Sequence, residues 1–142
     1  MTRRLLVLLV TLLAPAALAQ PCTTSWTDAA GGAWADGSKW DNGVPTATSV
    51  ACITLDGTYT VTVGGITTDV LRLGAASGTQ TLVAGGTLAF STSAEISANG
   101  VFEWTSGYMT SGTMTNSGLI RLTGSTGSRG VNGTTLRNQG TV

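Results

Sequence analysis

The sequence predicts an all-β protein, a parallel β-solenoid (β-helix) with rungs of about 20 residues and an N-terminal Trp-rich cap. Three observations predict it. The 142 residues include 20 Gly, 26 Thr and 12 Ser, a composition that disfavours helices and suits turn-rich β structure. A glycine-led unit recurs along the chain. Within each unit, apolar and polar residues alternate with the period of two that strands require.

Residues 1–19 match the three-part pattern of a secretory signal peptide. Arg3 and Arg4 are followed by an apolar run over residues 5–13 and by the small-x-small site Ala17-Leu18-Ala19. The run is shorter than the roughly 20 residues that cross a bilayer. The alternative is a buried N-terminal helix. The signal reading predicts an exported chain that begins at Gln20, is secreted or lies on the outer cell surface, and has no membrane span after cleavage.

Two cysteines follow, Cys22 and Cys52. In an exported protein they are expected to form one disulfide. The alternative is a pair of free thiols.

Residues 20–56 are predicted to form the cap. They contain Trp26, Trp34 and Trp40 between Gly-rich and Asp-rich turns, and they end in an alternating strand over residues 50–55. The three indoles are candidate ligand-contact aromatics that could stack on sugars. The plainer interpretation is a hydrophobic plug over the first rung, because each Trp buries a large area.

Residues 57–142 are predicted to be solenoid rungs. Each unit begins at a glycine, and the units recur at intervals of about 18–22 residues. Positions two and four after the glycine are expected to point into one core, with Gln80 as a polar exception. The runner-up is an antiparallel β-sandwich. The units begin at Gly57, Gly78, Gly100, Gly118 and Gly140, and the predicted core is Tyr59, Val61, Leu82, Phe102, Trp104, Ile120 and Leu122.

The last rung is unfinished. It begins at Gly140 and stops at Val142, which occupies the first inward position. Because stacked repeats need a cap at each end, we expect this chain to be the N-terminal part of a longer exported protein, and we expect association through the open C-terminal edge.

Charge and chemistry argue against several functions. The formal net charge is zero and the chain has no histidine, which disfavours nucleic-acid binding and His-based catalysis or zinc binding. The acids of the rungs are not expected to line up on one sheet, as polysaccharide cleavage would require. The turn over residues 36–42 lacks a calcium-loop pattern. We therefore predict no catalytic residues, no metal site and no cofactor; the acids are Asp56, Asp69, Glu95 and Glu103.

Four stretches of the sequence carry a resemblance to known proteins. They are the run W-A-D-G-S-K-W-D-N-G-V-P over residues 34–45, the T-V-T-V strand after it, N-S-G-L-I at 116–120 and N-Q-G-T-V at 138–142. They resemble the start of the right-handed β-helix in exported bacterial surface proteins, among them autotransporter-passenger-like and adhesin-like families. The resemblance implies a fold and an extracellular location.

Three functions are compared. The first is a non-catalytic structural or adhesive surface segment, whose partners would be glycans or host and cell-surface components. The second is a carbohydrate-binding or polysaccharide-degrading β-helix. The third, a minor alternative, is an ice-binding solenoid that uses the outward pairs Thr58/Thr60 and Thr79/Thr81, an array that breaks at Val101 and Glu103. We favour the surface segment.

Overall fold

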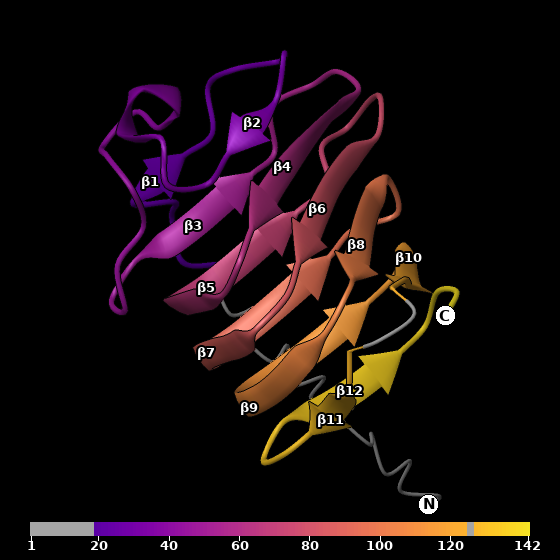
Figure 1. Cartoon of the computed structure of the whole chain (residues 1–142). Helices are drawn as coiled ribbons and strands as arrows, with labels where there is room; N and C mark the ends of the chain where they lie inside the picture. The colour runs from indigo at the N-terminus through magenta and orange to yellow at the C-terminus, as the bar shows by residue number, and fades with distance from the viewer. Residues whose placement is uncertain (1–18, 125–126) are drawn as a thin grey trace, which may run out of the picture.

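The computed structural model describes residues 19–124 and 127–142, and there the chain winds into a parallel β-solenoid of about four turns (Figure 1). The proposed signal peptide lies outside the described residues except for Ala19. Every strand pair is parallel, so the antiparallel sandwich considered from the sequence is wrong.

Successive turns contribute to two sheets. Sheet 1 has seven strands, in the order β1-β3-β5-β7-β9-β11, with β12 also paired to β9. They are β1 (Thr24–Ser25), β3 (Val50–Ile53), β5 (Ile66–Leu73), β7 (Thr87–Ile96), β9 (Gly107–Asn116), β11 (Arg129–Val131) and β12 (Thr135–Asn138). Sheet 2 has five strands, in the order β10-β8-β6-β4-β2. They are β2 (Gly32–Ala33), β4 (Tyr59–Val63), β6 (Gln80–Ala84), β8 (Gly100–Trp104) and β10 (Leu119–Leu122). A 3-10 turn, η1 (Gly37–Lys39), lies in the cap.

The core lies between the two sheets, where alternate residues of each strand meet. In β6 and β8 buried and half-buried residues alternate strictly, as the period of two predicts. Residues that pair from turn to turn form columns, and the clearest inward column of sheet 2 is fully apolar. Its members are Val61, Leu82, Phe102 and Ile120, and all four are buried.

The predicted register of sheet 2 is confirmed between β4 and β6 and between β8 and β10, but between β6 and β8 it differs from the prediction by two residues. The sequence predicted that Gln80 would stack on Phe102, but Gln80 pairs with Gly100, and Phe102 pairs with Leu82. Gly100 is itself the first residue of β8, and a Cβ there would come within 2.5 Å of the Leu73 carbonyl oxygen. The corner before β8 is therefore shorter than alignment of Gly78 with Gly100 implies. Because a shift of two keeps every side chain on its own face, the inward set survives.

Leu122 is the one predicted core residue that the structure does not bury. It pairs with Trp104, at the end of the column that also contains Val63 and Ala84, yet it is 55% exposed. Its direction was predicted correctly, but no described strand stacks on β10 at this position. The other predicted core residues are buried: Tyr59, Val61, Leu82, Phe102, Trp104 and Ile120.

Two buried amides complete the interior. Gln80, the predicted exception, accepts a hydrogen bond from the Ala75 N–H (2.6 Å) and donates to the carbonyls of Gly57 and Ser77. Asn116 donates to Asn138 Oδ1 (2.7 Å) and to the Thr141 carbonyl (3.0 Å). A buried amide that is fully hydrogen-bonded is tolerated in a core and fixes the turn around it.

Candidate functional site

The cap was the strongest candidate site, and its three tryptophans are buried. Trp26 and Trp40 meet edge to face with ring centroids 5.1 Å apart, and Trp34 and Trp40 do so at 4.8 Å. Two of the three indole N–H groups are used inside the cap: Trp40 donates to the Trp34 carbonyl (2.8 Å), and Trp26 to that of Asp28 (2.6 Å). The cluster is a plug. The alternative in which these indoles contact a ligand is not supported, since no indole face is open to solvent.

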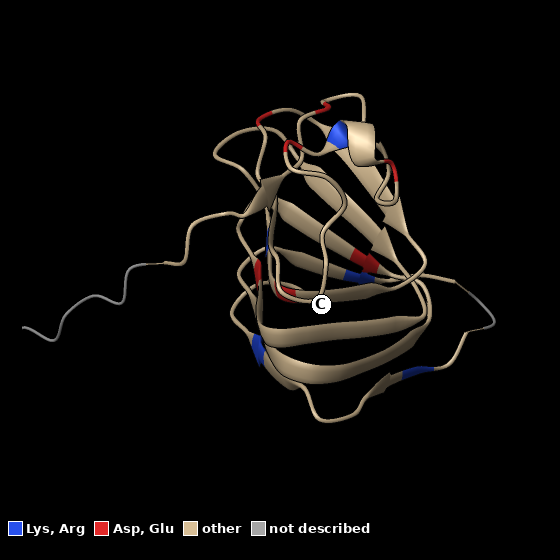
Figure 2. Ribbon diagram, turned by 90° about the vertical axis from the view of Figure 1, so that its left-hand side faces the viewer, with Lys and Arg blue, Asp and Glu red and all other residues tan. Residues whose placement is uncertain are grey.

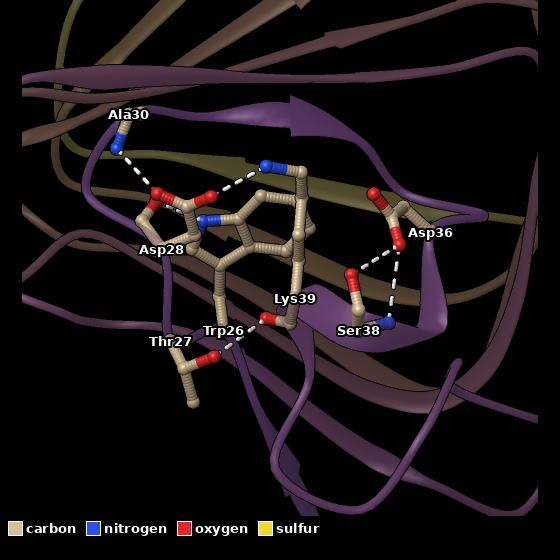
Figure 3. Close-up of polar contacts among 7 residues, drawn as sticks. All are labelled: Trp26, Thr27, Asp28, Ala30, Asp36, Ser38 and Lys39. Carbon is tan, nitrogen blue, oxygen red and sulfur yellow. Dashed lines mark hydrogen bonds and ion pairs between the residues drawn. The ribbon is translucent and has the colours of Figure 1, made fainter.

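The polar side chains next to the tryptophan plug form hydrogen bonds and an ion pair with one another and with nearby backbone groups (Figure 3). Lys39 Nζ lies 2.5 Å from Asp28 Oδ2, and Asp28 Oδ1 accepts from the Ala30 N–H. Asp36 caps η1 by accepting from the N–H of Ser38 (3.1 Å) and from its hydroxyl (2.6 Å). Hydrogen bonding to Lys39 lowers the pKa of Asp28, and hydrogen bonding to Ser38 lowers that of Asp36. These carboxylates stabilise turns of the cap.

The predicted disulfide is present. It joins Cys22 to Cys52 with the Cα atoms 5.9 Å apart and closes a separation of 30 residues. Cys52 lies on the outward side of β3, in a small buried cluster with Val50 and Val70. The bond therefore fastens the segment before β1 against the outer face of sheet 1.

The acids of the rungs are spread over both sheets. Asp56 accepts from the Ser77 N–H at a turn, and Asp69, at the bulge of β5, accepts from the Thr92 hydroxyl. Glu103 lies in β8 and pairs with Arg121 at 3.6 Å. Glu95 is the penultimate residue of β7, so it lies near the corner that precedes β8, as expected, and it faces Arg72. Asp69 and Glu95 do share sheet 1, in different columns.

The outward threonines of sheet 2 stack over two turns. Thr60 pairs with Thr81, and Thr58 Oγ1 accepts from the Thr79 N–H (3.2 Å). In the next turn Val101 lies beside Thr81. The hydroxyl array therefore ends where the sequence predicted.

Charge is distributed unevenly along the solenoid axis (Figure 2). Residues 20–56 contain four Asp and one Lys, whereas residues 104–142 contain three Arg and no acid. In Figure 2 acidic positions lie in the loops of the cap beside a basic position, charges of both signs lie in the middle of the molecule, and basic positions lie toward the opposite end. One of these arginines is held by the fold: Arg129 donates to the carbonyls of Trp104 (2.9 Å), Thr105 (2.8 Å) and Gly124 (3.1 Å). This contact could not be predicted from the sequence, because residue type and spacing do not show which carbonyls lie nearby.

Within residues 19–124 and 127–142 there is no pocket and no group of three His, Cys, Asp or Glu side chains that could hold a metal ion. In the same part of the chain, no helix is long and apolar enough to cross a membrane.

Comparison with known proteins found no matching family model, no similar curated protein and no similar solved structure.

Proposed function

We propose that this chain is an exported, non-catalytic structural or adhesive segment that works at the cell surface or outside the cell. The observation that carries the proposal is the Cys22–Cys52 disulfide, because such bonds persist in oxidising compartments outside the cytosol. The signal-like pattern of residues 1–19 agrees with it independently. The finer proposal, kinship with autotransporter-passenger-like or adhesin-like proteins, rests on the sequence resemblance alone.

The side chains on the surface favour a structural or binding role over catalysis. The rung carboxylates are engaged separately, by Arg72, Arg121, Thr92 and the Ser77 amide, rather than gathered as a pair around one substrate site. The outer faces consist mostly of short hydroxyl and aliphatic side chains. Such a rod presents extended rows of groups, which suits a spacer or a broad, weak contact with glycans or cell-surface components.

Export is tested by expressing the whole chain in a bacterial host and determining the mass and N-terminal sequence of the product in each cell fraction. The expected product starts at Gln20 and is found in the exported fraction. Replacing Ala19 by Arg at the cleavage site should block processing, whereas Ala16→Ser, outside the small-x-small site, should leave it intact. Unprocessed protein in the cytosol in all cases would overturn the proposal.

Function at the surface is tested on the purified protein with a glycan array and a polysaccharide-release assay run together. We expect no release of sugars. Binding without release would identify the segment as adhesive, and absence of both would leave the structural role. Release of reducing ends would contradict the proposal and favour the polysaccharide-degrading alternative.

A further inference from the structure

The N-terminal segment of the described chain is fastened along the outer face of sheet 1. Cys22 is bonded to Cys52 in β3. Two residues before it, the Gln20 carbonyl accepts a hydrogen bond from Arg72 Nη1 in β5 (2.5 Å). Because Cys52 and Arg72 pair with each other in neighbouring strands, both attachment points lie in one outward column. The segment therefore has a defined place as far back as Gln20, the first residue of the predicted mature chain.

The side chain of Gln20 is exposed, and the fold does not use it. Within residues 19–124 and 127–142, no hydrogen bond joins its amide to another residue, whereas its backbone carbonyl is held by Arg72. The buried Gln80 is the opposite case, because its amide accepts from one backbone group and donates to two. An accessible amide is thus left at the residue that signal cleavage after Ala19 would make N-terminal.

An N-terminal glutamine has a reaction that an internal glutamine lacks. Its uncharged α-amino nitrogen attacks the side-chain carbonyl carbon, Cδ. The bond from Cδ to the amide nitrogen breaks, and that nitrogen takes the amine proton and leaves as ammonia. The product is a five-membered lactam, pyroglutamate, and its formation needs no oxidant, metal or cofactor. Both reacting groups belong to one residue, which makes the attack effectively unimolecular.

The contact with Arg72 is compatible with this ring. The lactam contains the N, Cα, Cβ, Cγ and Cδ atoms of Gln20, but not the backbone carbonyl that Arg72 holds. Ring closure also removes the positive charge of the α-ammonium from a residue that already contacts a guanidinium, and like charges repel. This charge effect is small, because Glu95 pairs with the same arginine at 3.4 Å, but it favours the neutral lactam.

Pro21 gives the same amine a second possible target. Attack on the Pro21 carbonyl carbon would form a six-membered diketopiperazine and release residues 20–21. That ring requires the Gln20–Pro21 bond to be cis, because the bond itself is part of the ring. The bond is trans, and the Arg72 contact and the disulfide hold the chain on either side of it. The fold therefore favours the lactam over loss of the first two residues.

We propose that Gln20 is a modification site and that the mature chain begins with pyroglutamate, held through its carbonyl by Arg72. The proposal rests on the proposed export, since cleavage after Ala19 creates the N-terminus. The modified chain has no α-amine, the group by which aminopeptidases recognise a chain end, and the Cys22–Cys52 bond follows two residues later. This end of the protein is accordingly resistant to degradation outside the cell.

The mass of the N-terminal tryptic fragment tests the proposal. The whole chain is expressed, and the exported product is kept intact at physiological temperature for several days, sampled daily, and then reduced and digested. Residues 20–39 form one tryptic fragment, in which Gln20 is the only glutamine or asparagine, so loss of ammonia is assigned to it directly. The expected fragment is about 17 Da lighter than its sequence mass and yields no residue in Edman degradation. A fragment that begins at Gln20 and keeps its full mass would overturn the proposal, and so would one that lacks residues 20–21.

Gln20→Asn is the matched control. Asparagine keeps the amide but is one methylene shorter, so the same attack would have to close a strained four-membered ring. The fragment of this variant should keep its full mass, and an equal loss in both proteins would contradict the assigned reaction.

The same digest separates failure of this inference from failure of the proposed export. An unprocessed chain is cut after Arg4 and gives a fragment of residues 5–39. That fragment would overturn the proposed export and this inference with it, whereas an unmodified fragment 20–39 would overturn this inference alone.

Discussion

Replacing Trp104 by Ala probes the assigned core directly. Trp104 is buried at the last covered position of the column that contains Val63 and Ala84, and its Nε1–H donates to the Ser106 carbonyl at 2.8 Å. Truncation removes a large aromatic side chain and leaves a cavity between the sheets. Such truncations cost about 3–5 kcal/mol. This is a large share of the roughly 5–15 kcal/mol that stabilises an ordinary domain.

The matched control is Leu122→Ala, one turn further along the same column. Because Leu122 is 55% exposed, its truncation should cost less than about 1 kcal/mol. Urea unfolding followed by far-UV circular dichroism, with the disulfide intact, gives both values. A cost below about 1 kcal/mol for Trp104→Ala, or equal costs for the two variants, would show that the assignment of buried and open ends is wrong.

Further outcomes are expected for the disulfide, for Tyr59 and for the carboxylates of the cap. Replacing Cys22 and Cys52 together by Ser should cost about 3–4 kcal/mol in urea unfolding, and a reductant should destabilise the parent protein equally; unequal losses would contradict a bond that acts by restricting the unfolded chain. Tyr59→Phe should stabilise the protein by about 1 kcal/mol, because the buried Tyr59 hydroxyl makes no hydrogen bond of good geometry among the described residues, although the Leu55 backbone lies close to it. Burial raises the pKa of Tyr59 to about 12 from 10.0, so the unfolded chain loses this proton first and stability should fall from pH 10 to 12 in the parent but less in Tyr59→Phe. The pKa values of Asp28 and Asp36 are lowered from 3.8, so the stability that these carboxylates add is present above that pH and is lost below it. Asp28→Asn should therefore make the urea midpoint fall less steeply as the pH is lowered through the acid range. An unchanged dependence of the midpoint on pH would contradict the pairing of Asp28 with Lys39.

The alternation within each unit predicted the inward faces because it depends on strand geometry alone. Tyr59 and Val61 point inward in whichever way neighbouring turns are stacked, since every second residue of a strand shares a face. The disulfide was predictable on a different ground, because two cysteines in a chain that is expected to be exported are expected to pair. Predicting the plug required one further comparison, between burial of Trp26, Trp34 and Trp40 in the cap and their exposure to a ligand.

The register was predictable in part. Alignment of the glycines gives the observed pairing of β4 with β6 and of β8 with β10, but it places Gly78 beside Gly100, whereas Gly100 lies inside β8 and pairs with Gln80. It fails there because corners and bulges have lengths that the repeat does not encode. Sheet 1 accommodates the difference in rung length through register shifts between Thr68 and Val70 and between Ala89 and Ser93. Bulges of this kind insert residues without turning the flanking side chains to the wrong face.

Function was harder to predict for the same reason. A site on a solenoid is a row of side chains from several turns, so it depends on which residues become neighbours across turns. Glu103 and Arg121 stand at the same position of successive units, so alignment of the glycines already places them side by side. By contrast, the pairing of Glu95 with Arg72 follows only once β5 and β7 are in their observed register, which contains a shift between Thr68 and Val70. Likewise, Leu122 is apolar and inward in the sequence, and its exposure follows only from its place in β10, on which no described strand stacks at that position. The exposure of a side chain in a solenoid therefore depends on the assembled turns as well as on its own strand, which is why the matched pair Trp104→Ala and Leu122→Ala is the sharpest test of the assigned core.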